Sequence, residues 1–282
     1  MATARQRPSA KLDAPPAAPS AAPSTPEAAP FGLSPRVHNV VSYGGAVAVF
    51  LGAVLLQKEA RRCPAFADTR EAELLWPCEL AAVCWVLHFV RRTAEAAYLH
   101  RFSQPTVPWD DTATEYLYYW GFAYWIARSL VCADSATKEW STINDVGAVV
   151  WLIAEVGNCA CHVQLARLRP AGADAGKREL SLPSGGCFSL NLSFPHYFCE
   201  ISSWVGWNLL VGLPTLPDAS RSFSDPLAAA APFGGVAFAT VGACIMASWA
   251  FDKHAKLRDH CDGKEGRPPF PPHRKRIIPM VF

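Results

Sequence analysis

The sequence predicts an all-α, polytopic integral membrane protein, and three properties of the chain support this fold class. Hydrophobic residues make up 51% of its 282 positions, and the mean hydropathy is +0.10. Charged residues make up only 18%. Apolar runs of about the length that a helix needs to cross a bilayer, roughly 20 residues, recur along the chain. We therefore expect a helical bundle with about six spans.

Six apolar segments define these expected spans. Residues 40–56 contain no charged side chain and are at the short end of the spanning range. Residues 187–213 are long enough for a bent span, or for a span that follows a re-entrant piece. The other four expected spans cover residues 74–90, 116–133, 146–168 and 227–250.

The distribution of positive charge predicts the orientation of these spans. With six spans, the N-terminus, two of the loops and the C-terminal tail lie on one side of the membrane. That side holds 19 of the 26 Lys and Arg residues. Because cytosolic segments of membrane proteins are enriched in these residues, we expect both termini to face the cytosol.

Residues 1–35 differ from the rest of the chain in composition. They are rich in Pro, Ala and Ser and lack the apolar core of a secretory signal. Such a segment buries too little apolar surface to offset the entropy lost on ordering, so we expect a disordered arm. A membrane reductase domain would then occupy residues 36–282. The basic, acid-poor start of the arm keeps an organellar transit peptide as an alternative.

Cysteines and common soluble motifs give no support for a metal site or a standard nucleotide fold. The ten cysteines are scattered, most of them lie in the expected spans, and their spacing fits no zinc motif. We expect them to pack as small apolar residues, and we expect no metal site. The motifs GxGxxG, GxxxxGK[ST], HExxH and GxSxG are absent from the sequence. We also expect no nucleic acid partner.

Polar side chains inside the expected spans are the main functional signal. An ionisable group at mid-bilayer costs about 2.5–3.5 kcal/mol to insert, so it usually faces the protein interior or a cavity. Asn158 and His162 share a helical face because they are four residues apart. The same or neighbouring segments carry His88, Arg91, Arg92, Glu95, Glu155, His196, Tyr197 and Glu200. We expect these groups to line a polar cavity open to the cytosol, with hydrogen bonding between helices as the simpler alternative for each residue alone.

Five stretches of the chain resemble the steroid 5-alpha-reductase superfamily. They are HFVRRTAEAAYLHRFSQPTVP, YYWGFAYWIA, GNCACHVQLARLRPAG, LPSGGCFSLNLSFPHYFCEISSWVGW and HRKRIIPMVF, and they follow the family's order between residues 88 and 282. Within the superfamily, the YYWGFA, LRPAG and HRFSxxTxP phrases are most similar to the trans-2-enoyl-CoA reductases of very-long-chain fatty acid elongation. Several motifs in order are a more specific signal than any one of them.

The resemblance implies an NADPH-dependent reductase of the endoplasmic reticulum membrane. Its substrate would be a long-chain trans-2-enoyl-CoA, and other enzymes of the elongation cycle would be candidate partners in the bilayer. The family's proton-donating tyrosine falls on Tyr197 and its glutamate on Glu200, and Arg91 stands at a further catalytic position. The positions associated with NADPH fall on Asn158, His162, Arg169, His196, Lys253, His254 and Arg274.

Four positions depart from the family pattern. His196 and Arg91 replace an asparagine and a lysine, and Phe89 and Leu257 each replace a tyrosine. The first 35 residues stand where enoyl-CoA reductases typically have a ubiquitin-like domain. Three alternatives therefore stay open: a steroid or polyprenol enone reductase, a membrane methyltransferase, and a non-catalytic lipid-binding protein. The methyltransferase lacks support, because its usual Glu-Glu pair beside an arginine is missing after Arg267.

The residue types also suit enoyl reduction on chemical grounds. When a hydride adds to the β-carbon of an enoyl thioester, negative charge develops on the thioester oxygen, and a donor aimed at that oxygen lowers the barrier. Tyrosine stays protonated at neutral pH and can donate there or deliver a proton to the α-carbon. We expect Glu200 and His196 to orient Tyr197. Basic side chains at the cytosolic mouth would pair with the phosphates of NADPH and CoA.

Overall fold

The computed structural model describes residues 32–59, 77–102, 104–131, 140–168, 185–212, 233–263 and 269–279. Its long α-helices are α1 (Pro35–Glu59), α2 (Cys78–Ala94), α3 (Trp109–Val131), α4 (Thr142–Arg167), α5 (Pro195–Val211) and α7 (Gly234–His260). Within these ranges the only sheet is one antiparallel pair, β1 (Gly32–Leu33) with β2 (Val107–Pro108). The predicted all-α fold is confirmed.

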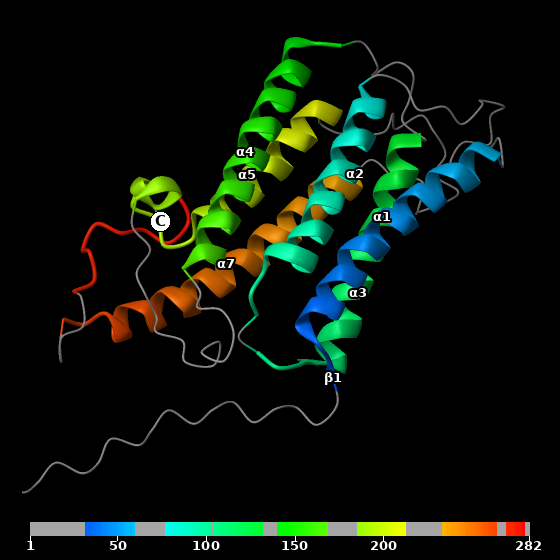
Figure 1. Cartoon of the computed structure of the whole chain (residues 1–282). Helices are drawn as coiled ribbons and strands as arrows, with labels where there is room; N and C mark the ends of the chain where they lie inside the picture. The colour runs from blue at the N-terminus through cyan, green and yellow to red at the C-terminus, as the bar shows by residue number, and fades with distance from the viewer. Residues whose placement is uncertain are drawn as a thin grey trace, which may run out of the picture.

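The helices pack as two pairs with α2 between them. α1 lies along α3, and α4 lies along α5 in the most extensive helix contact of the fold (Figure 1). α2 contacts α1, α3 and α5, and α7 crosses the bundle against α3 and α5 (Figure 1). Polar groups on α2, α4 and α5 are therefore brought together although their segments are far apart in the sequence.

Three of the described helices are long and apolar enough to cross a membrane. They are residues Pro35–Leu56 of α1, all of α4 and all of α7. The outer face of α4 shows why, since it exposes a row of apolar side chains at helical spacing: Val146, Val149, Leu152, Ile153 and Val156. Such a surface suits lipid rather than water. The chain is thus a helical membrane protein, and the expected number of six spans remains a prediction.

Local sequence explains where three of the helices begin. Ser141 and Asn144 form a capping box at the start of α4, and Pro195 occupies the first turn of α5, where its missing N–H costs nothing. α3 starts at Trp109, earlier than the apolar run at residues 116–133 predicts. Asp110 and Asp111 favour this start because carboxylates in a first turn interact well with the helix dipole.

The expected long span at residues 187–213 is divided in the structure. A short 3-10 helix, η4 (Gly186–Leu190), ends at Asn191, which has a left-handed φ of 54°. The chain then continues without helix to Pro195, and the C-terminal segment hydrogen-bonds to this stretch. Ser193 N–H donates to the Lys275 carbonyl at 2.8 Å, and Phe194 N–H donates to the Arg276 carbonyl at 3.1 Å. Backbone groups left without a helix partner are thereby satisfied.

Aromatic side chains form the centre of the core. Trp85 of α2 is fully buried, and its ring lies 4.7–6.0 Å from the rings of five other aromatic residues. These neighbours come from α1, α2, α5 and α7: Phe50, Phe89, Trp204, Trp207 and Phe238. One end of this aromatic core meets the polar groups described below, so it fixes the helices that carry them.

The predicted boundary of the membrane domain at residue 36 needs a small correction. Gly32–Leu33 pairs with Val107–Pro108, and α1 begins at Pro35, so the folded domain includes the last residues of the predicted arm. A Cβ at Gly32 would collide with the Val107 carbonyl, which explains why glycine occupies this position. The expectation of disorder for residues 1–31 lies outside the described residues.

The close contact of α4 with α5 gives a first testable prediction. A Cβ added to Gly206 would lie within 3.0 Å of backbone atoms of Gly147 and Trp151. We expect Gly206→Ala to lower the free energy of unfolding by about 1–3 kcal/mol, because backbone atoms cannot move aside as a side chain can. Gly52→Ala in α1 is the matched control, since its Cβ would meet nothing within 4 Å. Thermal unfolding in detergent should separate the two, and equal midpoints would contradict the packing.

Candidate active site

His88 holds two glutamates together at the inner end of the polar cluster. Its Nδ1 lies 2.8 Å from the Glu155 carboxylate and its Nε2 lies 3.2 Å from that of Glu200, so α2 is joined to α4 and α5. Ionised carboxylates only accept hydrogen bonds, whereas a neutral imidazole has one donor and one acceptor nitrogen. This triad therefore holds a proton beyond the one on a neutral imidazole, either on His88 or on one of the glutamates.

Arg91 links the triad to Glu95 and Asn158 by hydrogen bonds. Its Nε donates to Glu155 at 2.9 Å, and its Nη1 donates to Glu95 at 2.5 Å and to the Asn158 side-chain oxygen at 3.0 Å. Asn158 is almost fully buried and donates in turn to the backbone carbonyl of His196 at 2.8 Å. The predicted residues Arg91, Asn158 and Glu200 thus belong to one buried network.

Arg92 extends the network toward α1. Its Nη1 donates to Glu95 at 2.7 Å and lies 2.7 Å from Nε2 of His162, and its Nη2 reaches the Tyr43 hydroxyl at 3.4 Å. The guanidinium also lies over the Tyr43 ring, 5.2 Å from its centroid. Because an arginine only donates, Nε2 of His162 must accept and the proton of a neutral His162 ring is on Nδ1.

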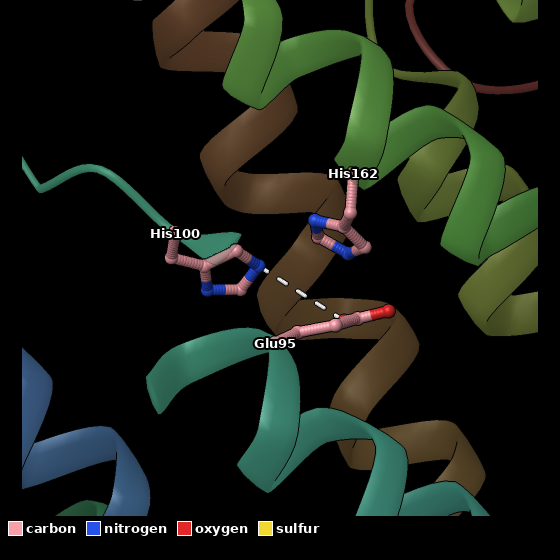
Figure 2. Close-up of side chains that lie close together, drawn as sticks. All are labelled: Glu95, His100 and His162. Atoms are coloured by element: carbon pink, nitrogen blue, oxygen red, sulfur yellow. Dashed lines mark ion pairs between the residues drawn. The ribbon is translucent and has the colours of Figure 1, made fainter. Parts of the chain in front are cut away.

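Glu95, His100 and His162 come close enough to resemble a metal site. Figure 2 shows the carboxylate and the two imidazole rings converging from η1 (Glu95–Leu99), the residue after it and α4, and one ligand atom of each lies within 4.8 Å of the others. Arg91 and Arg92, however, each bond one Glu95 oxygen, and Arg92 also meets His162. Two guanidinium groups at these atoms disfavour a bound cation, so this cluster is better suited to an anion nearby.

Tyr197 has a different partner from the one we expected. Lys253 of α7 donates to its hydroxyl at 2.7 Å, and the ammonium group lies 5.3 Å from the ring centroids of Tyr197 and Trp249. Glu200 instead bonds His88 and the Trp204 indole N–H. These contacts do not support the prediction that Glu200 orients Tyr197. An ammonium only donates, so the tyrosine proton stays available to another acceptor.

His196 lies between the network and Tyr197. Its ring centroid is 4.3 Å from that of Tyr197 and 5.6 Å from that of His162. Its Nδ1 is buried and has no hydrogen-bond partner among the described residues. A buried polar atom without a partner is costly, and such atoms often mark a place that a ligand completes.

His254 and Arg274 belong to a second cluster, beside the C-terminal segment. Nδ1 of His254 lies 3.0 Å from the Ser193 hydroxyl, and the Arg274 guanidinium donates twice to the Leu192 carbonyl. Burial lowers the pKa of Arg274, which still leaves this guanidinium charged at neutral pH. Both side chains line a basic cavity of about 650 Å³ together with Arg258, Lys275 and Arg276.

The predicted site residues therefore fall into three groups. Arg91, Asn158, His162 and Glu200 form the buried network, with His196 at its edge. Tyr197 and Lys253 form a pair next to His196, while His254 and Arg274 line the basic cavity. Arg169 lies outside the described residues. Sequence reasoning did not single out Tyr43 or Trp204, because a lone aromatic residue in an apolar run has no distinguishing local pattern.

Comparisons with known proteins show what this chain is similar to. The sequence profile described as 3-oxo-5-alpha-steroid 4-dehydrogenase matches residues 111–217, which include α4 and α5 with the network residues Glu155, Asn158, His162 and Glu200. The network residues of α2 and η1 lie before the matched range. This profile belongs to the steroid 5-alpha-reductase superfamily, and the part of the chain that it matches is similar to that domain. The superfamily resemblance noted in the sequence is thereby confirmed.

Curated relatives of this superfamily domain are named as enoyl-CoA reductases. The "Very-long-chain enoyl-CoA reductase" of Dictyostelium discoideum is 31% identical over 208 residues, which is 72% of this chain and 58% of the relative. The "Probable very-long-chain enoyl-CoA reductase" of Caenorhabditis elegans is 28% identical over 208 residues, or 72% of this chain and 59% of the relative. The chain thus spans slightly less than three fifths of the length of these relatives.

Proposed function

We propose that this chain reduces the trans-2 double bond of a long-chain or very-long-chain enoyl-CoA with NADPH, as in the last step of fatty acid elongation. The observation that carries the proposal is the Tyr197 hydroxyl, which accepts from Lys253 beside a buried charge network. The names of the relatives support the reaction class. In purified protein, NADPH should be consumed when a trans-2-hexadecenoyl-CoA is added, and no enoyl-CoA-dependent consumption would contradict the proposal.

Residues of this chain supply the proton that the reaction needs. Bound NADPH would supply a hydride to the β-carbon of the substrate. Tyr197 then donates its proton toward the developing negative charge, or to the α-carbon, and Lys253 stabilises the phenolate that remains. Glu200 of the triad lies three residues from Tyr197 on α5, and we infer that the extra proton held by His88, Glu155 and Glu200 serves to reprotonate the site.

Residues around the site fit a phosphate-bearing nicotinamide cofactor. The unpartnered Nδ1 of His196 can take a hydrogen bond from a ligand, and the cavity lined by His254, Arg258 and Arg274 is strongly basic. Charge-assisted hydrogen bonds from such groups are the usual means of holding phosphates. Asn158, His162 and Arg169 would complete the cofactor site that the resemblance implies.

The preference between nicotinamides gives a second prediction. NADPH should be preferred to NADH, because the basic cavity has charge available for a 2′-phosphate. Arg258→Ala should raise the KM for NADPH about fivefold, since an exposed charge contact contributes about 1 kcal/mol, and should leave the KM for NADH unchanged. Lys256→Ala is the control, because Lys256 is exposed on the same helix but does not line the cavity. Equal use of both nicotinamides by the parent would contradict the assignment.

The same proposal includes a membrane and an orientation of the chain in it. Both termini would face the cytosol in the endoplasmic reticulum membrane, where the basic loops meet soluble NADPH and the bilayer supplies the acyl chain. Other membrane enzymes of the elongation cycle would hand over the substrate. A glycosylation acceptor appended to the C-terminus should stay unmodified in cells, and its glycosylation would reverse the proposed orientation.

A steroid enone is a second candidate substrate, because the matching profile is described as a 3-oxo-5-alpha-steroid 4-dehydrogenase. The same tyrosine could protonate a reduced enone, so the network does not discriminate between the two substrates. A 3-oxo-4-ene steroid should be turned over much more slowly than the enoyl-CoA if the first proposal holds. The reverse order of kcat/KM would favour the steroid.

A further inference from the structure

A second basic basin, which shares no lining residue with the cavity at His254, is not used by the reaction as proposed. It has a volume of about 360 Å³ and lies between the start of α1, the π-helical turn η1 and the end of α4. Its lining residues include Arg36, Tyr98, His100, Arg101 and Arg167. None of these five was among the residues expected to hold NADPH.

The charge of this basin suits a polyanion. Three arginines and one histidine line it, and no carboxylate is among the described residues that line it. Arg36 donates to the carbonyl of Ala97, which lies in the π-helical turn η1. Arg167 is exposed in the last turn of α4. Guanidinium groups that converge on one hollow without an acidic residue are typical of phosphate recognition.

Tyr98 adds an aromatic platform to the basin. Its side chain is 90% exposed, although large aromatic residues are usually at least partly covered. The π-helical turn accounts for this position, since it holds Glu95 buried in the network and turns Tyr98 outward within four residues. Single π-helical turns are rare and occur often at functional sites. An exposed ring beside arginines is the combination that binds an adenine base and its phosphates.

The basin is continuous with the network at His100. The His100 ring lies beside that of His162 (Figure 2), with 4.9 Å between the ring centroids. His162 in turn contacts Arg92. A ligand whose phosphates are held in the basin can therefore extend toward the Arg92 side of the site. The reaction as proposed needs two adenine nucleotides, and the cavity at His254 accounts for one of them.

We propose that this basin binds the phosphoadenosine end of the acyl-CoA substrate, an inference that rests on the proposed function. Arg36, Arg101 and Arg167 take the phosphates, and Tyr98 stacks on the adenine. NADPH also contains an adenosine with phosphates, so the test has to distinguish CoA from NADPH as the ligand of this basin. A crossed set of variants does this.

The test measures binding of free CoA and of NADPH separately, by calorimetry on the purified full-length chain. Arg167→Ala should weaken CoA binding about tenfold and leave NADPH binding unchanged, since one charged contact to phosphate is lost. Tyr98→Ala should weaken CoA binding to a similar degree, whereas Tyr98→Phe keeps the ring and should not. Arg258→Ala, in the other cavity, should weaken only NADPH. The lining side chains replaced are exposed, so the variants should fold.

A second arm removes groups from the substrate. The parent should show a lower KM for trans-2-hexadecenoyl-CoA than for its 3′-dephospho form or the N-acetylcysteamine thioester, and Arg167→Ala should narrow this difference. Weaker NADPH binding in Arg167→Ala would assign the basin to the cofactor, and unchanged CoA binding in both variants would overturn the proposal outright. If Arg167→Ala weakens CoA binding but the parent never reduces an enoyl-CoA, the proposed function is wrong. The assignment of CoA to the basin is then still supported.

Discussion

Replacing Tyr197 with phenylalanine should reduce turnover by about 100- to 1000-fold, the usual cost of removing one positioned donor to a developing negative charge. The change removes one oxygen and the contact with Lys253, and it leaves the ring between Phe194 and Trp249 in place. Binding of substrate and cofactor should change far less, because the donor acts mainly in the transition state. The measurement is kcat with saturating NADPH and a long-chain trans-2-enoyl-CoA.

Tyr116→Phe is the matched control for this experiment. The Tyr116 hydroxyl donates to the His38 carbonyl at 3.3 Å, at the start of α1 and away from the network. This variant should lose about 0.5–1.5 kcal/mol of stability, as for one hydrogen bond, and keep its turnover per folded molecule. If the Tyr197 variant behaves in the same way, Tyr197 is a packing residue and the proton donor lies elsewhere.

The largest effect on stability is expected at Glu155. Its side chain is 8% exposed, and its carboxyl group lies against both His88 and Arg91. Glu155→Gln keeps the shape of the side chain but leaves His88 and Arg91 facing an amide in place of the carboxyl group. Removing one partner of a buried ion pair typically lowers the free energy of unfolding by about 3–5 kcal/mol. We expect a strong loss of folded protein in detergent and a thermal midpoint well below that of the parent.

Glu115→Gln provides the comparison, because Glu115 also pairs with a buried histidine. The Glu115 side chain is 30% exposed, and His38 keeps a second partner in Thr112. A partly exposed pair contributes about 1 kcal/mol or less, so this variant should unfold close to the parent. Similar midpoints for the two glutamine variants would show that the network on α2 and α4 does not stabilise the fold.

The helical fold could be predicted well from the sequence, because apolar runs are a local property. Each expected span overlaps a long helix among the described residues, and polar residues within the spans meet in the interior. The start of α3 was predicted too late, because residues 109–115 are mostly polar and lie outside the apolar run. Their helical form is favoured by carboxylates in the first turn and by the contact of Glu115 with His38 of α1. The short pairing of β1 with β2 has no sequence signal of its own.

The candidate site was predicted as a set of residues, but their pairing was not. His88 and Glu155 are 67 positions apart, and only the packing of α2 against its neighbours decides that they meet. Tyr197 was expected to pair with Glu200 one turn away, which local spacing favours. The bundle instead brings Lys253 to the hydroxyl from α7, a contact across 56 positions that no local pattern contains.

Isotope transfer tests the proposed reaction most directly. The purified chain is incubated with a trans-2-enoyl-CoA and NADPH deuterated at C4 of the nicotinamide, and the product is analysed by mass spectrometry. We expect a saturated acyl-CoA with one deuterium at the β-carbon. With unlabelled NADPH in heavy water, we expect one deuterium at the α-carbon instead. Label at the α-carbon from NADPH, or no saturated product at all, would contradict enoyl reduction by this site.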